Sequence, residues 1–399
     1  MKRIAIVVQR CHPSIVGGSE ALAWQYARLL SAHFEVEVLT SAASDYVSWR
    51  NDLPIGDETS EGIIVRRHAV EIARDPPYWS ELHARLLRDA KALREFPQAT
   101  RPYWREALED EFIRFQGPYC PTLHARLARE KDHYAAVVFC TYLYPTTYFG
   151  IRSVAPEKVI LVPTLHDEPP AYLRAFAELY SAYPHRIWLT DSERHVAERI
   201  WRFGGGEVIG MAVDHTESAE PERRDVPYFL YSGRIDESKG CRELLDAFAR
   251  FHKRSGADAK LVLTGVDKMD LPKRADIEFL GFVDDARKLA LMAGAAAFVM
   301  PSEYESFSIV TLEAMAQRTP VLVNERCEVL KDHVERSGGG FGFRSQEELA
   351  ALMGRVLTLD AAERTRIGDA GRRYVLERYS EAAIRDRLVA AVERVAAGA

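Results

Sequence analysis

The sequence predicts an α/β protein built from two parallel-sheet units in tandem. Its 399 residues are enough for two or three domains at about 150 residues each, and two is the better match. Short apolar runs alternate with helical patterns along most of the chain, which is typical of parallel strands joined by helices. The stretch Asp214–Pro227 is polar, contains proline and lacks a strand pattern, so it predicts the boundary between the units.

The first unit is predicted to begin with a buried strand and to contain five more. The run Ile4–Gln9 is apolar, and Gly17-Gly18 then opens a helix from about Ser19 to His33. The apolar runs that predict the later strands are Val36–Thr40, Ile63–Arg67, Ala136–Cys140, Val159–Leu165 and Ile187–Asp191. The aromatic and charged segment from Glu71 to Lys131 predicts helices and loops inserted between these strands.

The second unit repeats the alternation after the boundary. Its predicted strands are Tyr228–Ser232, Ala259–Thr264, Ile277–Leu280, Ala297–Met300 and Pro320–Val323. Its predicted helices are Cys241–Arg254, Ala286–Ala293 and Ile309–Gln317, and the end of the chain from Ala361 to Ala399 is helical as well. No sequence repeat relates the two units.

Composition and charge exclude several classes of protein. There are 53 Lys and Arg against 59 Asp and Glu, a net charge of −6, which argues against a sequence-blind nucleic-acid binder. The five cysteines lie far apart without a CxxC pattern, so neither a disulfide framework nor a zinc site is indicated. The longest nearly apolar run, Leu289–Met300, is shorter than the roughly 20 residues of a membrane span. Ile4–Val8 is too short for a signal-peptide core, and we expect a cytoplasmic protein.

Polar loops follow predicted strands at the sheet edge where α/β proteins bind ligands. In the loop Arg10–Ser19, Gly17 and Gly18 would let the backbone approach a ligand, and the next helix start favours an anion. A tight turn without a ligand would use the same residues. His166 follows the run Val159–Leu165, where a ligand contact and a purely structural role are both open.

The loops of the second unit carry charge. Arg234 and Lys239 lie between a strand and a helix, where two cations suit a diphosphate, although solvated surface cations would give the same pattern. Glu305 falls in a loop and Glu313 in the helix after it, with backbone N–H groups near Ser308 at the helix start. Such carboxylates can accept hydroxyl groups of a sugar, but the helix dipole favours acids there even without a function.

Taken together, these loops resemble those of the family 4 retaining glycosyltransferases over nearly the whole chain. The matching motifs are Glu305-x7-Glu313, Arg234-x4-Lys239-Gly240, the turn Phe279–Val283, Gly17-Gly18-x-Glu20 and His166-Asp167. The resemblance implies the α/β fold named GT-B, in which two Rossmann-like domains face a central cleft and a C-terminal helix crosses back to the first. The expected domains are 1–216 with the returning helix 378–399, on the acceptor side, and 217–377, on the nucleotide-sugar donor side.

The resemblance also implies roles for single residues. Arg234 and Lys239 would bind the donor diphosphate, Glu313 the ribose hydroxyls, and Glu305 the transferred sugar. His166 would touch that sugar near the reacting carbon. The remaining donor-binding residues would act largely through their backbone: Gly17 and Gly18 toward the phosphates, Phe282 and Val283 toward the base, and Ser306, Phe307 and Ser308 toward the sugar.

The implied activity is that of a retaining hexosyltransferase. It would move a hexose from GDP-mannose or a UDP-hexose to a hydroxyl of a glycan or lipid-linked acceptor, with the leaving phosphate taking the acceptor proton. No Asp-x-Asp pair occurs, so we expect no metal and no other cofactor, with Arg234 and Lys239 supplying positive charge instead. Many relatives have glycines at the positions of Ser306 and Ser308, which leaves the donor sugar open.

Two other functions stay open, namely a sugar-nucleotide epimerase on the same fold and a non-catalytic nucleotide-sugar binding subunit. The segment Glu71–Lys131 is either a set of packing helices or a wall of the acceptor pocket. Its balanced charge gives little attraction to anionic lipid, so peripheral contact with the inner face of the membrane is expected to be weak. The expected partners are thus a GDP- or UDP-linked donor and the acceptor, with no nucleic acid.

Overall fold

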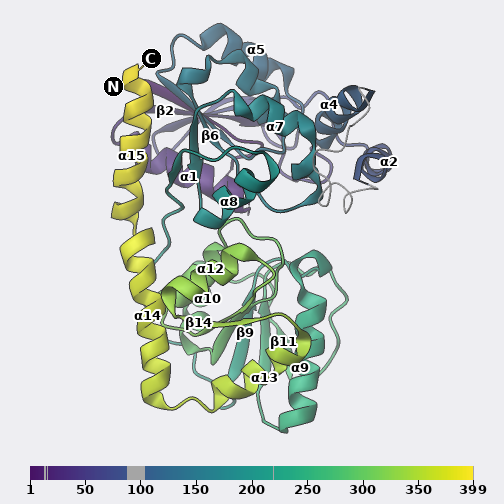
Figure 1. Cartoon of the computed structure of the whole chain (residues 1–399), viewed down its shortest axis with the longest axis vertical. Helices are drawn as coiled ribbons and strands as arrows, with labels where there is room; N and C mark the ends of the chain where they lie inside the picture. The colour runs from purple at the N-terminus through teal and green to yellow at the C-terminus, as the bar shows by residue number, and fades with distance from the viewer. Residues whose placement is uncertain (13–14, 16, 88–103, 219, 399) are drawn as a thin grey trace. The chain divides into compact units, whose positions relative to one another are not determined.

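The chain folds into two compact units in the computed structural model, which describes residues 1–12, 15, 17–87, 104–218 and 220–398. Met1–Met211 and Arg385–Ala399 form the first unit, and Ala212–Ile384 form the second. Each unit has a twisted sheet at its centre with helices packed outside it (Figure 1). Two α/β units of this kind make up the GT-B fold.

Within the residues that the structure describes, the sheet of the first unit has eight strands. In spatial order they are β3 (Gly56–Ser60), β4 (Ile63–His68), β2 (Glu35–Ser41), β1 (Arg3–Val7), β5 (Ala136–Cys140), β6 (Val159–Val162), β7 (His185–Trp188) and β8 (Glu207–Val208). Every pairing is parallel except β3 with β4, which is antiparallel. The central strands are buried along nearly their whole length, as the continuous apolar runs predict.

Three strands of this unit end before the predicted residue, and β1 is the first of them, since it ends at Val7 and not at Gln9. Strand β6 ends at Val162 and not at Leu165, and β7 ends at Trp188 and not at Asp191. Asp191 instead begins helix α8 (Asp191–Ile200), because the side chain of Thr190 accepts a hydrogen bond from the Glu193 N–H at 3.0 Å and caps the helix. Strands β3 and β8 were not predicted. The sequence of β3, GDETS, is polar and mostly exposed at the sheet edge, and β8 has only two residues.

The sheet of the second unit has six strands, all paired in parallel. Their order is β11 (Ile277–Phe279), β10 (Lys260–Thr264), β9 (Tyr228–Ser232), β12 (Ala297–Met300), β13 (Val321–Asn324) and β14 (Gly340–Phe343). The five predicted strands are confirmed within two residues at each end, and β14, with the sequence GFGF, carried no signal. Strands β9 and β12 are neighbours, so the loops that follow them leave the sheet side by side.

Helices connect the strands in both units. The other helices of the first part of the chain are α1 (Gly18–Ser31), α2 (Pro76–Leu87), α4 (Trp104–Gln116), α5 (Pro121–Glu130), α6 (Pro145–Tyr148) and α7 (Arg174–Ser181). After β9 come α9 (Cys241–Ser255), α10 (Asp285–Gly294), α11 (Ile309–Ala316), α12 (Glu328–Ser337), α13 (Gln346–Leu357), α14 (Ala361–Tyr379) and α15 (Glu381–Gly398).

The segment Glu71–Lys131 forms helices that pack on the first unit. Leu82 on α2, Phe112 on α4 and Leu123 on α5 are buried in the same apolar cluster, and Trp79 stacks on Phe112 with ring centroids 6.1 Å apart. Residues 88–103, with the aromatic side chains of Phe96 and Tyr103, lie outside the described residues. These contacts give the helices a packing role, and a further role as a wall of the acceptor pocket stays a prediction.

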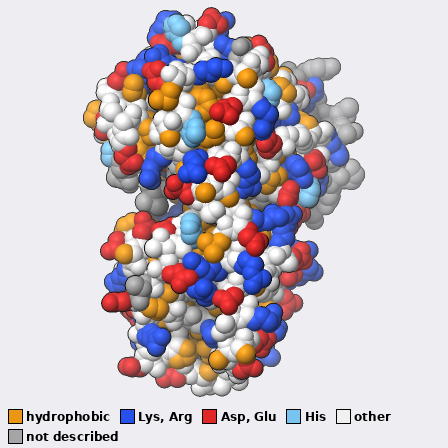
Figure 2. All heavy atoms as spheres, turned by 90° about the vertical axis from the view of Figure 1, so that its left-hand side faces the viewer, with side chains coloured by type: hydrophobic (Ala, Val, Ile, Leu, Met, Phe, Trp, Pro, Cys, Tyr) orange, Lys and Arg blue, Asp and Glu red, His pale blue; other side chains and the backbone are white. Residues whose placement is uncertain are grey.

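Charged side chains of both signs are mixed on one face of the molecule. Figure 2 shows Lys and Arg interspersed with Asp and Glu on the face it presents, without a broad region of one sign. Within the described parts of the chain, no helix is both long and apolar enough to cross a membrane.

Candidate functional site

A salt bridge joins the two loops that leave the neighbouring strands β9 and β12. Lys239 Nζ donates to Glu305 Oε1 at 2.7 Å, across 66 positions of sequence, and both side chains are largely buried. Glycine is required beside them, because a Cβ on Gly240 would lie 2.4 Å from the Pro301 carbonyl oxygen and the residue has a φ of 73°. The sheet topology therefore brings together two of the side chains that the sequence singled out.

Asp236 organises the cationic loop. Its Oδ1 accepts hydrogen bonds from the Lys239 N–H at 3.0 Å and from Ser238 Oγ at 2.6 Å, and its Oδ2 pairs with Arg234 Nε. Burial alone would raise the pKa of Asp236, but the hydrogen bonds from Ser238 and Arg234 lower it below the usual value for an aspartate. The carboxylate is thus ionised at neutral pH and holds Arg234 beside Lys239. The sequence signal that could have identified Asp236 is the presence of an acidic residue two positions after Arg234.

Glu313 lies on α11 and is almost fully buried. Its carboxylate is 3.0 Å from Lys288 Nζ, and Lys288 also contacts Asp285 at 3.0 Å, both on α10. Burial raises the pKa of Glu313, and the charge of Lys288 offsets only part of that effect. Lys288 Nζ donates a hydrogen bond to Glu313 Oε1 at 3.1 Å and lies 3.0 Å from Oε2. A carboxylate has about four lone-pair sites, so this ion-paired group retains acceptor capacity for a ligand hydroxyl. Lys288 was missed because a lysine in a helix is usually a surface residue.

The loop between Glu305 and α11 has an unusual backbone. Ser308, the residue before α11, has φ 58° and ψ 62°, the left-handed conformation that serine rarely adopts. Phe307 is buried, and its carbonyl oxygen accepts a hydrogen bond from His333 at 2.9 Å. In the turn after β11, by contrast, Phe282 is 71% exposed, next to Gly281, which has a φ of 68°.

The glycine loop of the first unit rests on a buried ion pair. Arg10 Nη2 lies 2.5 Å from Glu20 Oε1, and Gln9 Nε2 donates to the same carboxylate at 3.2 Å. A Cβ on Gly17 would lie 2.2 Å from Glu20 Oε2, whereas a Cβ on Gly18 would have no atom within 4 Å. Gly17 therefore fits against the carboxylate that Arg10 fixes, and Gly18 leaves open space at the start of α1.

This difference predicts opposite outcomes for two alanine variants. Gly17→Ala must displace the Glu20 carboxylate from Arg10, which exposes or unpairs a buried charge and is expected to lower stability by about 1–3 kcal/mol. Gly18→Ala is expected to leave stability unchanged or slightly raised, because the site is helical and unobstructed. Urea unfolding of both variants measures this, and equal destabilisation would contradict the role given to Glu20.

His166 lies in the loop after β6, with Nδ1 3.7 Å from Glu168 Oε1. Leu165, the residue before His166, is held by Glu193 on α8. The Glu193 carboxylate accepts hydrogen bonds from the N–H groups of Leu165 at 2.7 Å and Leu189 at 2.6 Å. Burial raises the pKa of Glu193 to about 8, against the lowering effect of these N–H groups. His166 itself is partly exposed, so its ring is accessible to a ligand.

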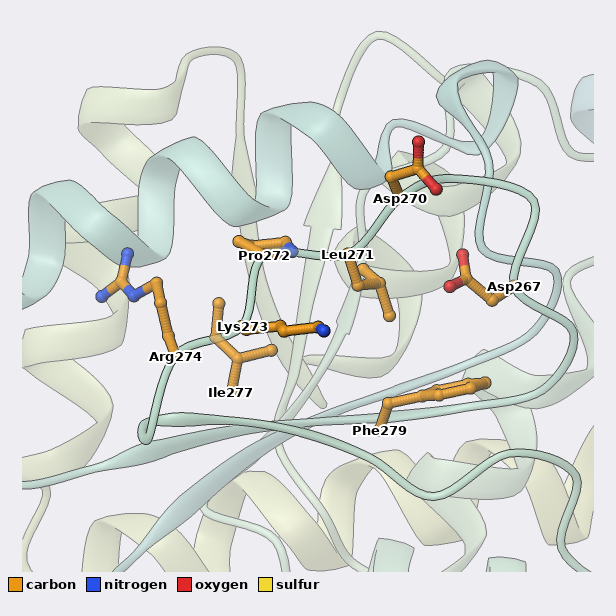
Figure 3. A pocket seen from close by; sticks show the side chains of 8 residues that line it. All are labelled: Asp267, Asp270, Leu271, Pro272, Lys273, Arg274, Ile277 and Phe279. Carbon is orange, nitrogen blue, oxygen red and sulfur yellow. The ribbon is translucent and has the colours of Figure 1, made fainter.

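A pocket of about 470 Å³ runs along strand β11 of the second unit (Figure 3). Leu271, Pro272, Ile277 and Phe279 give it an apolar lining, and its charged residues are Asp267, Asp270, Lys273 and Arg274. None of Arg234, Lys239, Glu305 and Glu313 lines it. Over the described residues, no group of three or more His, Cys, Asp or Glu side chains is placed to hold a metal ion.

Part of the chain is similar in sequence to known glycosyltransferases. Residues 214–374 match the family of glycosyl transferases group 1. A 33% identity over 168 residues links the chain to an uncharacterized glycosyltransferase of Methanocaldococcus jannaschii, covering 39% of this chain and 42% of that protein. An MMP alpha-(1→4)-mannosyltransferase of Mycolicibacterium hassiacum is also 33% identical, over 171 residues, covering 40% of this chain and 41% of that protein. The matched part thus spans under half the length of these relatives.

The fold is shared over the full length with solved structures. The sucrose-phosphate synthase of Thermosynechococcus elongatus superposes with a TM-score of 0.70 at 19% identity and covers all of both chains. At this identity the likeness shows the fold. The sequence match, in contrast, contains Arg234, Lys239, Glu305 and Glu313 within its bounds. We conclude that the chain has a GT-B fold and contains a glycosyl transferases group 1 domain at residues 214–374.

Proposed function

We propose that this protein is a retaining glycosyltransferase that moves a hexose from a nucleotide sugar to a hydroxyl of a glycan or lipid-linked acceptor. The observation that carries the proposal is the Lys239–Glu305 ion pair, which joins the loops after β9 and β12 inside the matched domain. A diphosphate needs cations and a sugar needs carboxylate acceptors, and this pair offers one of each at a single strand edge.

Binding of the donor would exchange the partners of these side chains. Without a donor, Lys239 is neutralised by Glu305, and Arg234 is paired with Asp236. A diphosphate carries more negative charge than either carboxylate, so it would draw both cations toward itself. Glu305 would then be released toward the hydroxyl groups of the sugar. Positive charge from Arg234 and Lys239 would stabilise the leaving phosphate, which takes the proton of the acceptor hydroxyl on the same face.

The remaining predicted residues are assigned to the same reaction. Glu313, which is paired with Lys288, would hold the ribose through its remaining lone pairs, and the exposed turn at Phe282 and Val283 would meet the base. Ser306, Phe307 and Ser308 would offer backbone donors to the sugar. In the first unit, the open space at Gly18, beside Gly17, would admit phosphate, and His166 would touch the sugar near the reacting carbon.

The donor and acceptor are proposed as classes. Similarity to a mannosyltransferase favours a mannosyl donor, and GDP-mannose and UDP-hexoses are the donors to test first. The acceptor is a glycan or lipid-linked hydroxyl. The balanced charge of the segment Glu71–Lys131 offers little attraction to an anionic membrane, so contact with the inner face of a membrane is expected to be weak.

Product analysis with a radiolabelled nucleotide sugar tests the proposal against its alternatives. A transferase gives labelled acceptor, or slow release of free sugar with retained anomeric configuration when no acceptor is present. An epimerase gives an interconverted nucleotide sugar, and a binding subunit returns the donor unchanged. Interconversion, or an inert donor across GDP-, UDP- and ADP-sugars with a panel of glycan and lipid-linked acceptors, would contradict the proposal.

Turnover is expected to survive excess EDTA. Arg234 and Lys239 supply the charge that a divalent ion would otherwise place on the diphosphate, so chelation should change the rate by less than about twofold. The assay compares donor turnover in EDTA, in buffer and in added magnesium or manganese. Complete loss in EDTA that is restored by either metal would reject the metal-independent mechanism.

A further inference from the structure

A buried chain of hydrogen bonds lies behind the loop that joins Glu305 to helix α11. His333 on α12 is fully buried, with Nε2 2.9 Å from the Phe307 carbonyl oxygen and Nδ1 3.0 Å from the Tyr374 hydroxyl. The Tyr374 hydroxyl is in turn 3.3 Å from that of Tyr379, and both tyrosines are on α14. Three segments of the second unit therefore meet at one histidine.

The proton positions in this chain follow from its chemistry. A carbonyl oxygen only accepts, so Nε2 carries the proton and donates it to Phe307. Nδ1 then has a lone pair and accepts from the Tyr374 hydroxyl, whose oxygen accepts from Tyr379. Burial lowers the pKa of His333 to about 4, so the ring is neutral at physiological pH and keeps this tautomer.

The contact with Phe307 fixes the direction of one peptide group. In a trans peptide the C=O and N–H point in opposite directions, so the Ser308 N–H points away from His333 when the Phe307 oxygen points toward it. Within the described part of the chain, no backbone carbonyl accepts a hydrogen bond from that N–H. Ser308 also holds a left-handed backbone conformation that is unfavourable for serine and needs support from its surroundings.

We propose that His333 is a positioning residue that holds the Phe307–Ser308 peptide so that the Ser308 N–H faces the nucleotide-sugar donor. This inference rests on the proposed function, which assigns the Ser308 N–H as a backbone donor to the sugar. The packing of the Phe307 ring agrees with this inference. The ring lies edge-on to Tyr379, with ring centroids 5.2 Å apart, and edge-on to His333, with centroids 6.1 Å apart. The loop is therefore held through both the carbonyl group and the side chain of Phe307.

Two substitutions of similar size separate positioning from general stability. His333→Gln places an amide nitrogen near the former Nε2 and keeps the bond to Phe307. His333→Asn reaches only the former Nδ1 position, so it keeps a partner for Tyr374 and loses the bond to Phe307. Each variant forfeits one of two buried hydrogen bonds, and their melting temperatures are expected to fall by similar amounts. A purely structural role would give them similar activity as well.

Hydrogen exchange and kinetics on the full chain provide the test. If His333 positions the loop, amides in residues 305–311 exchange faster in His333→Asn than in His333→Gln. The kcat is then expected to fall roughly tenfold or more in His333→Asn but less than about threefold in His333→Gln. Equal exchange in the two variants would overturn the inference, whatever the activity. If the wild type turns over no nucleotide sugar, the proposed function fails by itself, and the exchange comparison still decides whether His333 holds the loop.

Discussion

Arg234→Ala and Lys239→Ala are each expected to weaken nucleoside diphosphate binding by about 1.5–3 kcal/mol, roughly ten- to hundredfold in Kd. Each variant loses a charge-assisted bond to phosphate. Each also leaves an unneutralised carboxylate beside the ligand, because Asp236 pairs with Arg234 and Glu305 pairs with Lys239. Repulsion between that carboxylate and the phosphates places the expected loss toward the upper end of the range. Calorimetric titration with GDP and UDP measures it.

Arg242→Ala provides the matched control for this prediction. Arg242 is on α9, close in sequence to Lys239, but its side chain is 55% exposed and pairs with the exposed Glu237. Exposed ion pairs contribute little, so its removal should leave the nucleotide Kd within about twofold. If Arg234→Ala and Lys239→Ala bind GDP and UDP as tightly as Arg242→Ala does, the diphosphate does not bind at the loop after β9.

Glu305→Gln and Glu313→Gln are expected to separate in steady-state kinetics. Glu305 lies at the end of the sheet beside Lys239 and is assigned to the sugar, where positive charge develops as the bond to phosphate breaks. Its charge should count for more in the transition state than in the ground state, so Glu305→Gln should lower kcat by on the order of tenfold or more. Nucleoside diphosphate affinity should change little, because the diphosphate lacks the sugar.

Glu313→Gln should act on binding instead. The ribose does not react, so its contacts are alike in the ground and transition states, and losing them raises the donor KM while kcat stays nearly constant. Nucleoside diphosphate affinity should fall in parallel. Because Lys288 would lose its buried partner, the melting temperature of this variant has to be measured beside its kinetics. A swapped pattern would reverse the two assignments, and normal kinetics in both variants would contradict the transferase proposal.

Strand bounds were predicted most accurately where a strand is buried along its whole length. Strands β5, β9 and β12 match their predicted bounds because every residue in them is buried. The edge strand β3 is polar and exposed, and β14 is half glycine, so their pairing depends on neighbours that a local pattern does not contain. The end of β7 was missed because Thr190 caps α8, and capping competes with strand extension at that point.

The charged residues of the candidate site were visible in the sequence, but their partners were not. Arg234 and Lys239 follow a strand, and Glu305 precedes a helix, which local patterns predict. That Lys239 meets Glu305 follows from β9 lying beside β12, a long-range pairing. Lys288 looked like an ordinary surface lysine, and His333 like an ordinary helix residue, because the groups they contact, Glu313 and the Phe307 carbonyl, lie in other segments of the chain.

The most direct test of the central proposal, that the second unit holds a nucleotide-sugar donor through Arg234 and Lys239, is thermal unfolding of the wild type and of the Arg234→Ala/Lys239→Ala double variant. Each is melted with GDP, UDP, ADP and their sugars. A nucleotide that binds is predicted to stabilise the wild type by about 2.7 kcal/mol at 100 times its Kd and to leave the double variant unshifted at the same concentration. Equal stabilisation of both proteins, or no shift of the wild type with any of these nucleotides, would contradict it.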